Sequence, residues 1–268
     1  MKKKFPLLFS FLLPLLVYAQ NNEGVIVYKQ TINMHRNLPN EQMKQYIPEF
    51  QTYESELMFK GKTTLFKPKK SDQPDAQQQH QMGAAGGEGP GFRMMSMRRR
   101  DNTVVYRDLE ANTQIEATNF MDKDFLVEGI DSANVSGWKV TGKQKMVAGY
   151  PCLSATRSDS LMGRPREITA WFTPAIPIQA GPQSFGGLPG MILEIDMNQG
   201  QTVTTATSVA FKTLEEGLLV MPDKGKKVTR EEYRKLVDER MKEMRQMSGG
   251  GPGGPGAGGV FIIRNDND

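Results

Sequence analysis

Short runs of β-branched and aromatic residues follow one another along most of the chain, with turn residues and no helical pattern between them. This spacing constrains the fold strongly, because parallel strands need connections of a dozen or more residues, which are usually helical. The runs therefore predict antiparallel pairing of about ten strands, at residues 24–34, 56–66 (divided by a turn at Gly61-Lys62), 103–106, 113–117, 125–128, 138–141, 143–147, 152–157, 166–173, 191–197 and 202–211. The expected fold is mainly β: a large antiparallel twisted sheet or an incomplete barrel.

One amphipathic helix is predicted near the C-terminal end of this region. Thr229 precedes Glu232 by three residues, which is the pattern of a capping box. The apolar residues that follow share one helical stripe: Tyr233, Leu236, Val237, Met241 and Met244. The stripe is expected to pack on the sheet, with a partner protein as the alternative. The pattern also allows a shorter helix at residues 40–47, with Pro48 as its stop.

The first nineteen residues, 1–19, have the pattern of a signal peptide. Lysines at positions 2–4 precede an apolar run from Phe5 to Val17, and Ala19 supplies a small residue at the cleavage point. A retained membrane anchor is the alternative, but the run is short for a hydrocarbon layer about 30 Å thick and contains proline. Cysteine is absent from the cleavage point. The pattern therefore predicts an exported protein of the periplasm or outer-membrane periphery, not a lipoprotein, with no transmembrane segment after signal removal.

The charge of the exported form argues against nucleic acid as a partner. The 268-residue chain has 34 basic and 30 acidic residues, and its formal net charge is +4. Loss of the three signal lysines lowers the basic residues from 34 to 31, so the exported form is nearly neutral. The net charge therefore gives no support for nucleic acid as a partner, and an exported location argues against it.

Residues 20–247 are predicted to form a single β-rich domain. At about residues 67–102 a segment rich in Gln, Gly and Met predicts a disordered insert, because it cannot bury enough apolar surface to offset its chain entropy. Residues 248–268 form a Gly/Pro-rich tail with a short apolar end from Val260 to Arg264. That end could add to a sheet edge of the domain or to a partner.

One connection between predicted strands is stiff and rich in turn residues. Pro174 and Pro177 lack a backbone N–H donor, so the preceding strand must end there. Several glycines follow, with the apolar residues Phe185 and Leu188 among them. The connection is expected to close one end of the sheet over its core. The alternative is a rim that binds a ligand or partner, with Trp171, Phe185 and Leu188 as its contact residues.

Two stretches of the chain together resemble a known family. Residues 187–192 read Gly-Leu-Pro-Gly-Met-Ile, and residues 148–156 read Ala-Gly-Tyr-Pro-Cys-Leu-Ser-Ala-Thr. In this order they resemble the GLPGLI family of exported proteins from Bacteroidota, and the resemblance covers roughly residues 24–211. Met191 replaces the usual leucine of the motif, which is a substitution that conserves volume.

The resemblance implies a cell-envelope protein that works with an outer-membrane receptor of the TonB-dependent type. It implies no catalytic residues and no cofactor. The strand pattern also resembles, at the level of the fold alone, the half-barrel of periplasmic lipoprotein carriers. The expectation is therefore a non-enzymatic binding or accessory protein of the cell envelope.

Few residues of the chain could carry catalysis or hold a metal. His35 and His80 are the only histidines and Cys152 is the only cysteine, so the paired ligands of a zinc site are missing. Cys152 lies in an alternating stretch and is expected to be buried as a small apolar side chain. Glu194 and Asp196 share one side of a predicted strand, where an exposed strand face explains both.

One group of side chains favours an alternative function, the handling of copper. Thioether sulfurs and an imidazole suit Cu(I) in an oxidising compartment. Five such residues crowd the predicted insert: His80, Met82, Met94, Met95 and Met97. An adaptable contact surface or a compositional bias explains the same methionines without a metal.

Overall fold

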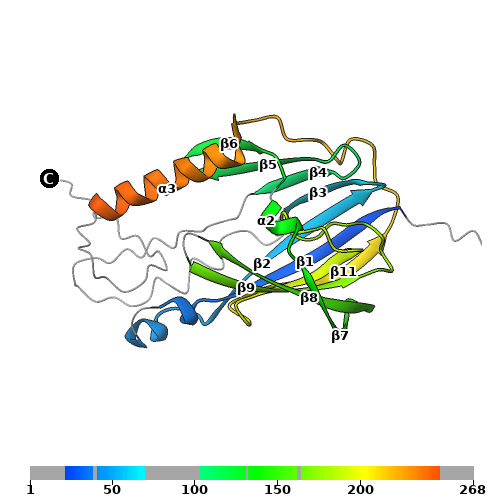
Figure 1. Cartoon of the computed structure of the whole chain (residues 1–268), viewed down its shortest axis with the longest axis horizontal. Helices are drawn as coiled ribbons and strands as arrows, with labels where there is room; N and C mark the ends of the chain where they lie inside the picture. The colour runs from blue at the N-terminus through cyan, green and yellow to red at the C-terminus, as the bar shows by residue number, and fades with distance from the viewer. Residues whose placement is uncertain (1–21, 39–40, 70–102, 131, 162–163, 248–268) are drawn as a thin grey trace, which may run out of the picture.

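Twelve strands of one sheet and one long helix account for most of the residues that the computed structural model describes, which are 22–38, 41–69, 103–130, 132–161 and 164–247 (Figure 1). The strands are β1 (Glu23–Asn33), β2 (Phe50–Lys60), β3 (Thr63–Pro68), β4 (Val104–Asp108), β5 (Thr113–Phe120), β6 (Lys123–Glu128), β7 (Lys139–Val147), β8 (Tyr150–Leu161), β9 (Arg164–Thr173), β10 (Met191–Met197), β11 (Thr202–Phe211) and β12 (Lys226–Thr229). The helices are the 3-10 turns η1 (His35–Asn37) and η2 (Glu41–Gln45), the short α2 (Ser132–Val135) and the long α3 (Arg230–Met247).

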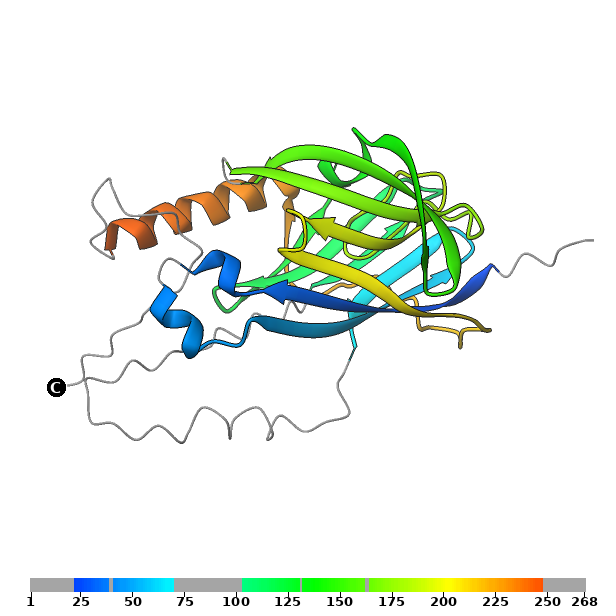
Figure 2. The same cartoon turned by 90° about the horizontal axis from the view of Figure 1, so that it is seen from below.

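The strands follow the order β12-β6-β5-β4-β3-β2-β1-β11-β10-β9-β8-β7 across the sheet. Every neighbouring pair is antiparallel except β12 with β6, which is parallel. β1 lies in the interior of the sheet, between β2 and the much later β11. The sheet is open and strongly twisted, with β8 and β9 arching over the central strands (Figure 2). The prediction of a large antiparallel twisted sheet is confirmed.

Two elements at the sheet edges differ from the sequence prediction. The two strands predicted at residues 138–141 and 143–147 form the single strand β7. Its pairing with β8 shifts register between Val140 and Gln144, and Gly142 has a φ of +76° there, so an irregularity interrupts the alternation without ending the strand. At the other edge, the parallel strand β12 was not predicted, because four residues with two exposed lysines carry no clear strand pattern.

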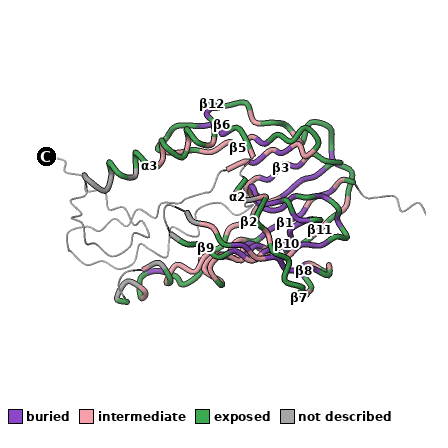
Figure 3. Tube along the Cα trace, in the orientation of Figure 1, coloured by how far each residue is buried: buried purple, intermediate pink, exposed green. Residues whose placement is uncertain are grey.

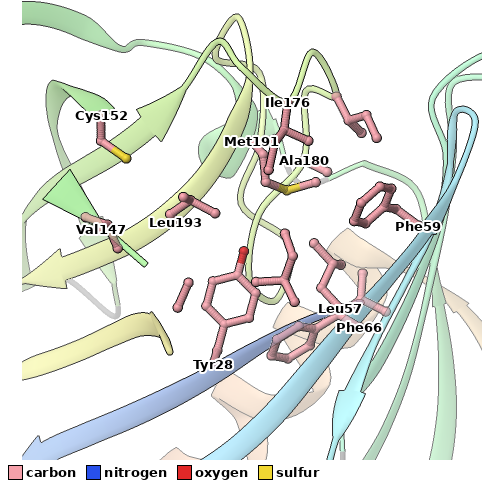
Figure 4. Packing of buried hydrophobic residues seen from close by; sticks show 14 residues of the cluster. Tyr28, Leu57, Phe59, Phe66, Val147, Cys152, Ile176, Ala180, Met191 and Leu193 are labelled. Carbon is pink, nitrogen blue, oxygen red and sulfur yellow. The ribbon is translucent and has the colours of Figure 1, made fainter. Parts of the chain in front are cut away.

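The core lies where the central strands meet the connection between β9 and β10. One cluster joins Tyr28 of β1, Leu57 and Phe59 of β2, and Met191 and Leu193 of β10. Figure 4 shows Ile176 and Ala180 of the connection beside Met191, with the ring of Tyr28 close to them. The Tyr28 hydroxyl donates a hydrogen bond to the Ile192 carbonyl at 2.7 Å, so the polar end of this fully buried ring is satisfied. Buried residues are concentrated on these strands, whereas β7 and α3 are largely exposed (Figure 3).

The predicted helix and its capping box are confirmed as α3. The Thr229 N–H donates to Glu232 Oε2 at 2.8 Å, and the Glu232 N–H donates to Thr229 Oγ1 at 3.2 Å. Tyr233 and Leu236 pack against a small cluster of β6 and β12 that contains Phe125 and Val228. This part of the stripe therefore packs on the sheet. Near residue 40, the described turn is the 3-10 helix η2 rather than the short helix that the sequence allowed.

Several sequence predictions concern residues outside the described ranges. They include the signal peptide at residues 1–19, the insert from residue 70 to 102 and the tail at residues 248–268. The first residues assigned to the insert, 67–69, are described. Residues 67 and 68 are the last two of β3, and residue 69 follows the strand. Among the described helices, none is long and apolar enough to span a membrane.

Candidate functional site

The connection between β9 and β10, residues 174–190, is a folded part of the domain that we call the connector. Backbone N–H groups at the start of β10 donate to it: Met191 N to Ile176 O at 2.9 Å, and Ile192 N to Ala180 O at 2.8 Å. Side chains alternate along its first part, so Ile176, Ile178 and Ala180 are buried while the residues between them are exposed. The connector is thus fixed to the sheet by main-chain bonds as well as by apolar contacts.

Phe185 and Leu188 of the connector lie inside the protein. Their exposed fractions are 3% and 2%, and they pack with Phe172 of β9 and Ile192 of β10 in a second buried cluster. They close the core, as the sequence analysis expected of this connection. They do not form the exposed rim of the alternative interpretation, because neither side chain presents apolar surface to a partner.

Gly190 illustrates how closely the connector approaches the sheet. Its φ is +149°, and a Cβ added there would overlap with the Thr173 carbonyl. We expect Gly190→Ala to lower the free energy of unfolding by about 1–3 kcal/mol. Gly190→Val should lower it further, because a β-branched side chain fits this backbone conformation worst. Urea unfolding measures both.

Gly129→Ala is the matched control for this prediction. Gly129 also has a positive φ, +103°, but a Cβ there would meet no atom within 4 Å. The Gly129→Ala variant therefore measures the cost of a positive φ alone, without an overlap between the added Cβ and another atom. Equal losses for Gly190→Ala and Gly129→Ala would show that the close approach at Gly190 contributes nothing.

Arg107 of β4 ties the connector to the other half of the sheet. Its side chain is buried, with 4% of the residue exposed. Nε and Nη2 donate to Gln114 Oε1 at 3.0 and 2.6 Å, and Nη2 also donates to the Ser184 carbonyl at 2.6 Å. Nη1 donates to the Phe185 carbonyl at 3.4 Å. A cation is therefore held against the connector backbone.

A second arginine, Arg157 of β8, holds the connector from the other side. Its guanidinium lies 4.9 Å from the centroid of Trp138 and 5.7 Å from that of Phe185. Trp138 Nε1 in turn donates to the Gly186 carbonyl at 3.0 Å. Arg157 also pairs with Asp159 at 2.9 Å. The aromatic and ionic contacts fix the middle of the connector in one position.

A groove of about 540 Å³ lies along the outer side of the connector. Its walls come from the turn between β2 and β3, the end of β4, the segment around α2 and the connector itself. The residues that line it are Gly61, Lys62, Arg107, Leu109, Asn112, Ile130, Val135, Pro177, Ile178, Gln179 and Gly187. The volume falls within the range of small-molecule clefts, about 300–1,000 Å³. The groove is the candidate functional site.

Gly187 joins the motif to the wall of this groove. Its φ is +76°, and a Cβ there would overlap with the Val135 carbonyl. The backbone of the connector therefore lies directly against the segment around α2. The motif shapes the groove through its backbone, while Leu188 next to it anchors the core.

Trp171 lies outside the groove lining. Lys145 Nζ sits 4.4 Å from the centroid of its ring and pairs with Glu194 at 2.5 Å. Thr205 Oγ1 donates to the same carboxylate at 3.1 Å. Trp171 is thus half-buried beneath a lysine, and the structure does not bring it together with Phe185 and Leu188 in one binding surface.

The two carboxylates that share one side of β10 are both engaged. The side chain of Glu194 is 12% exposed, so the expectation of an exposed strand face is wrong for this residue: its carboxylate pairs with Lys145 of β7. Asp196 accepts a hydrogen bond from the Gly200 N–H at 2.6 Å and stabilises the turn before β11. Both therefore have structural roles.

Cys152 is buried, as predicted, with 1% of the residue exposed. Burial raises the pKa of its thiol to about 11, so the thiol stays protonated and unreactive at neutral pH. The residues of the copper hypothesis, His80, Met82, Met94, Met95 and Met97, lie outside the described ranges. Within those ranges, no cluster of three His, Cys, Asp or Glu side chains could hold a metal ion.

Sequence reasoning missed Lys62, Arg107 and Gln114. The only signal for Arg107 was its alternation in phase with Val105, which marks it as facing the same side as a core residue. Its bond to Gln114 joins directly opposed positions of β4 and β5. Its bond to the connector joins residues 77 positions apart, which no local pattern reveals.

Comparison with solved structures supports the fold. A structure of PNGF-II in the P21 space group superposes with a TM-score of 0.50 at 14% identity, covering 81% of this chain and 34% of that one. A second structure of PNGF-II, in the C2 space group, gives 0.49 at 14% identity, covering 81% of this chain and 33% of the other. The chain spans about a third of these structures, and the likeness at this identity concerns the fold alone.

Sequence comparison gives one local match. No curated protein matches the chain by sequence. A family model described as "Protein of unknown function (Porph_ging)", associated with Bacteroidota, matches residues 161–194. This match runs from the end of β8 through β9 and the connector into β10. The chain is therefore similar, over the segment that closes its core and walls its groove, to a family of proteins of unknown function.

Proposed function

We propose that this protein is an exported, non-enzymatic binding or accessory protein of the cell envelope, and that the groove beside the connector is its binding site. The observation that carries the proposal is the construction of the connector. Its buried face is held by Arg107 and Arg157, while its exposed residues Pro177, Gln179 and Gly187 wall the groove. A wall fixed in this way is preorganised, which lowers the entropy lost on binding.

The proposed location rests on sequence features. The pattern of residues 1–19 is typical of an exported protein that carries no lipid anchor. The motif at residues 187–192 resembles the GLPGLI family, and the Bacteroidota-associated match over residues 161–194 includes it. We therefore propose a periplasmic position at the outer membrane, with an outer-membrane receptor of the TonB-dependent type as the partner.

Site-specific crosslinking in intact cells tests this proposal. A photo-crosslinking residue in place of Gln179 lies on the exposed wall of the groove, and we expect it to capture an outer-membrane receptor. The matched control carries the same residue in place of Lys123, an exposed position in the β5–β6 hairpin. The antiparallel pairing of β3, β4, β5 and β6 places this hairpin at the opposite end of the strands from Lys62.

The location and the partner have separate readouts. Fractionation of the cells should place the full chain in the envelope. Recovery of an uncrosslinked monomer from the cytoplasm would contradict the proposal, as would equal capture of the same partner from positions 179 and 123.

A further inference from the structure

The sheet has two outer edges, and one of them is a long exposed strand. At one edge, β12 has four residues, and its one apolar side chain, Val228, is buried. At the other edge, β7 has nine residues, and among the described strands only β8 pairs with it. The side chains of Val140 and Met146 on β7 are 57% and 64% exposed. β7 therefore presents unpaired main-chain groups together with uncovered apolar surface.

The charge of β7 restricts which strands can pair with it. The strand carries three lysines, at positions 139, 143 and 145, and no acid. Lys145 is neutralised by Glu194, whereas Lys139 and Lys143 are exposed and form no ion pair with another described residue. Pairing of β7 with β7 of a second copy would bring like charges together. The exposed lysines thus disfavour most strands and favour one that carries acids.

One segment of this chain has the complementary composition. Residues 260–268 read Val-Phe-Ile-Ile-Arg-Asn-Asp-Asn-Asp, so an apolar half made of strand-forming residues precedes a half with one arginine and two aspartates. If this segment runs antiparallel to β7, its apolar half lies toward Met146 and its aspartates lie toward Lys139 and Lys143. A parallel orientation would separate the aspartates from both lysines. The composition therefore favours antiparallel addition.

The position of α3 determines which copy of β7 this segment reaches. α3 follows β12, at the edge of the sheet opposite to β7. In both views the C-terminal end of α3 points away from β7 (Figures 1 and 2). Twelve residues, 248–259, separate α3 from the apolar half and span at most about 40 Å. A connection that starts at this end of the molecule leads toward a neighbouring copy rather than back to β7 of its own chain.

We propose that residues 260–268 of one copy add to the outer edge of β7 in another copy as an antiparallel strand, so that the chain associates with itself through this junction. Main-chain hydrogen bonds along β7 provide affinity, and the contacts with Met146, Lys139 and Lys143 provide specificity. The junction lies on a different surface from the groove, so this proposal does not depend on the proposed function.

Sedimentation of the full mature chain over a range of concentrations tests the proposal. The unchanged chain should associate, and a chain that lacks residues 260–268 should remain a monomer. Lys139→Glu/Lys143→Glu should weaken association at least about tenfold, because two attractive charges become repulsive. The matched control, Lys123→Glu/Lys224→Glu, makes the same change of charge at exposed lysines outside β7 and should associate like the unchanged chain. Thermal melts of the four proteins should coincide.

Mixing two of these variants tests the junction directly. The chain that lacks residues 260–268 keeps the β7 edge, and Lys139→Glu/Lys143→Glu keeps the segment that adds to it. Each variant alone should be a monomer, but the mixture should form a dimer of one copy of each and no larger species. Amide hydrogen exchange at residues 139–147 should slow in the truncated partner alone, because only its β7 gains a neighbouring strand.

Each other outcome overturns the proposal. A monomer at every concentration, or association that persists without residues 260–268, would show that this junction does not form. A monomeric unchanged chain with slowed exchange at residues 139–147 would show pairing within one copy. Slowed exchange at residues 226–229 instead would assign the segment to β12. Equal loss of association in the two lysine variants would show an effect of net charge.

Discussion

Replacing Leu188 with alanine is expected to lower the free energy of unfolding by about 2–5 kcal/mol. Leu188 is 2% exposed and packs with Phe185 and Phe172. The substitution removes buried methyl groups and leaves a cavity that the connector cannot fill, because Arg107 and Gly190 fix its backbone. Urea unfolding of the mature chain measures the change.

Leu218→Ala is the matched control for this prediction. Leu218 is 38% exposed and lies outside the motif. The same substitution there should lower the free energy of unfolding by only about 0.5 kcal/mol. Ligand or partner affinity of Leu188→Ala should fall only as far as its folded fraction falls. An unchanged melt with abolished binding would show that Leu188 acts at a binding surface, contrary to its burial.

Replacing Asp159 with asparagine is expected to lower the free energy of unfolding by about 1.5–3 kcal/mol. Its carboxylate accepts hydrogen bonds from Arg166 Nε at 2.8 Å and Arg166 Nη2 at 2.7 Å, and from Arg157 Nη2 at 2.9 Å. Arg157 is 7% exposed and its guanidinium lies 5.7 Å from the centroid of Phe185, so loss of the carboxylate leaves a buried cation less well compensated and loosens the connector. The same urea experiment measures the loss.

The contacts of Asp159 with Arg166 and Arg157 also make the stability of the fold depend on pH. Hydrogen bonds from Arg166, and the charges of Arg166 and Arg157, hold the pKa of the Asp159 carboxyl below its ordinary value. A lowered folded pKa means that the stabilisation is fully present above the unfolded pKa, about 3.9. It is lost as the pH falls from there through the folded pKa. Asp159→Asn should lack this part of the acid destabilisation, whereas the exposed Asp223→Asn should keep it.

The strands were predictable because each signal was local. Alternation of apolar residues over a few positions marks a strand face. A turn such as Gly61-Lys62 marks a hairpin, and the pairing of β2 with β3 confirms it. The capping box of Thr229 and Glu232 marked the start of α3 in the same way. These features depend on residues that are neighbours in the sequence.

The candidate site was only partly predictable, because its contacts are long-range. The motif at residues 187–192 identified the connector, yet nothing local showed that Arg107 would hold it. Glu194 was expected on an exposed face because its partner Lys145 lies 49 positions earlier. The parallel strand β12 was missed for the same reason: its pairing with β6 spans about a hundred residues, and its own sequence is nearly all polar.

The interior position of β1 determines when the sheet can be completed. The Thr207 hydroxyl donates to the Val27 carbonyl, a contact that spans 180 positions. Because so long a loop must close before its contacts form, such pairing slows folding. A chain emerging from the ribosome can pair β2 to β6 locally, but it cannot seat β1 against β11 until Phe211 has been made. Until then one side of β1 remains an unpaired edge that another strand can join. The nascent chain is therefore the form most in need of a chaperone.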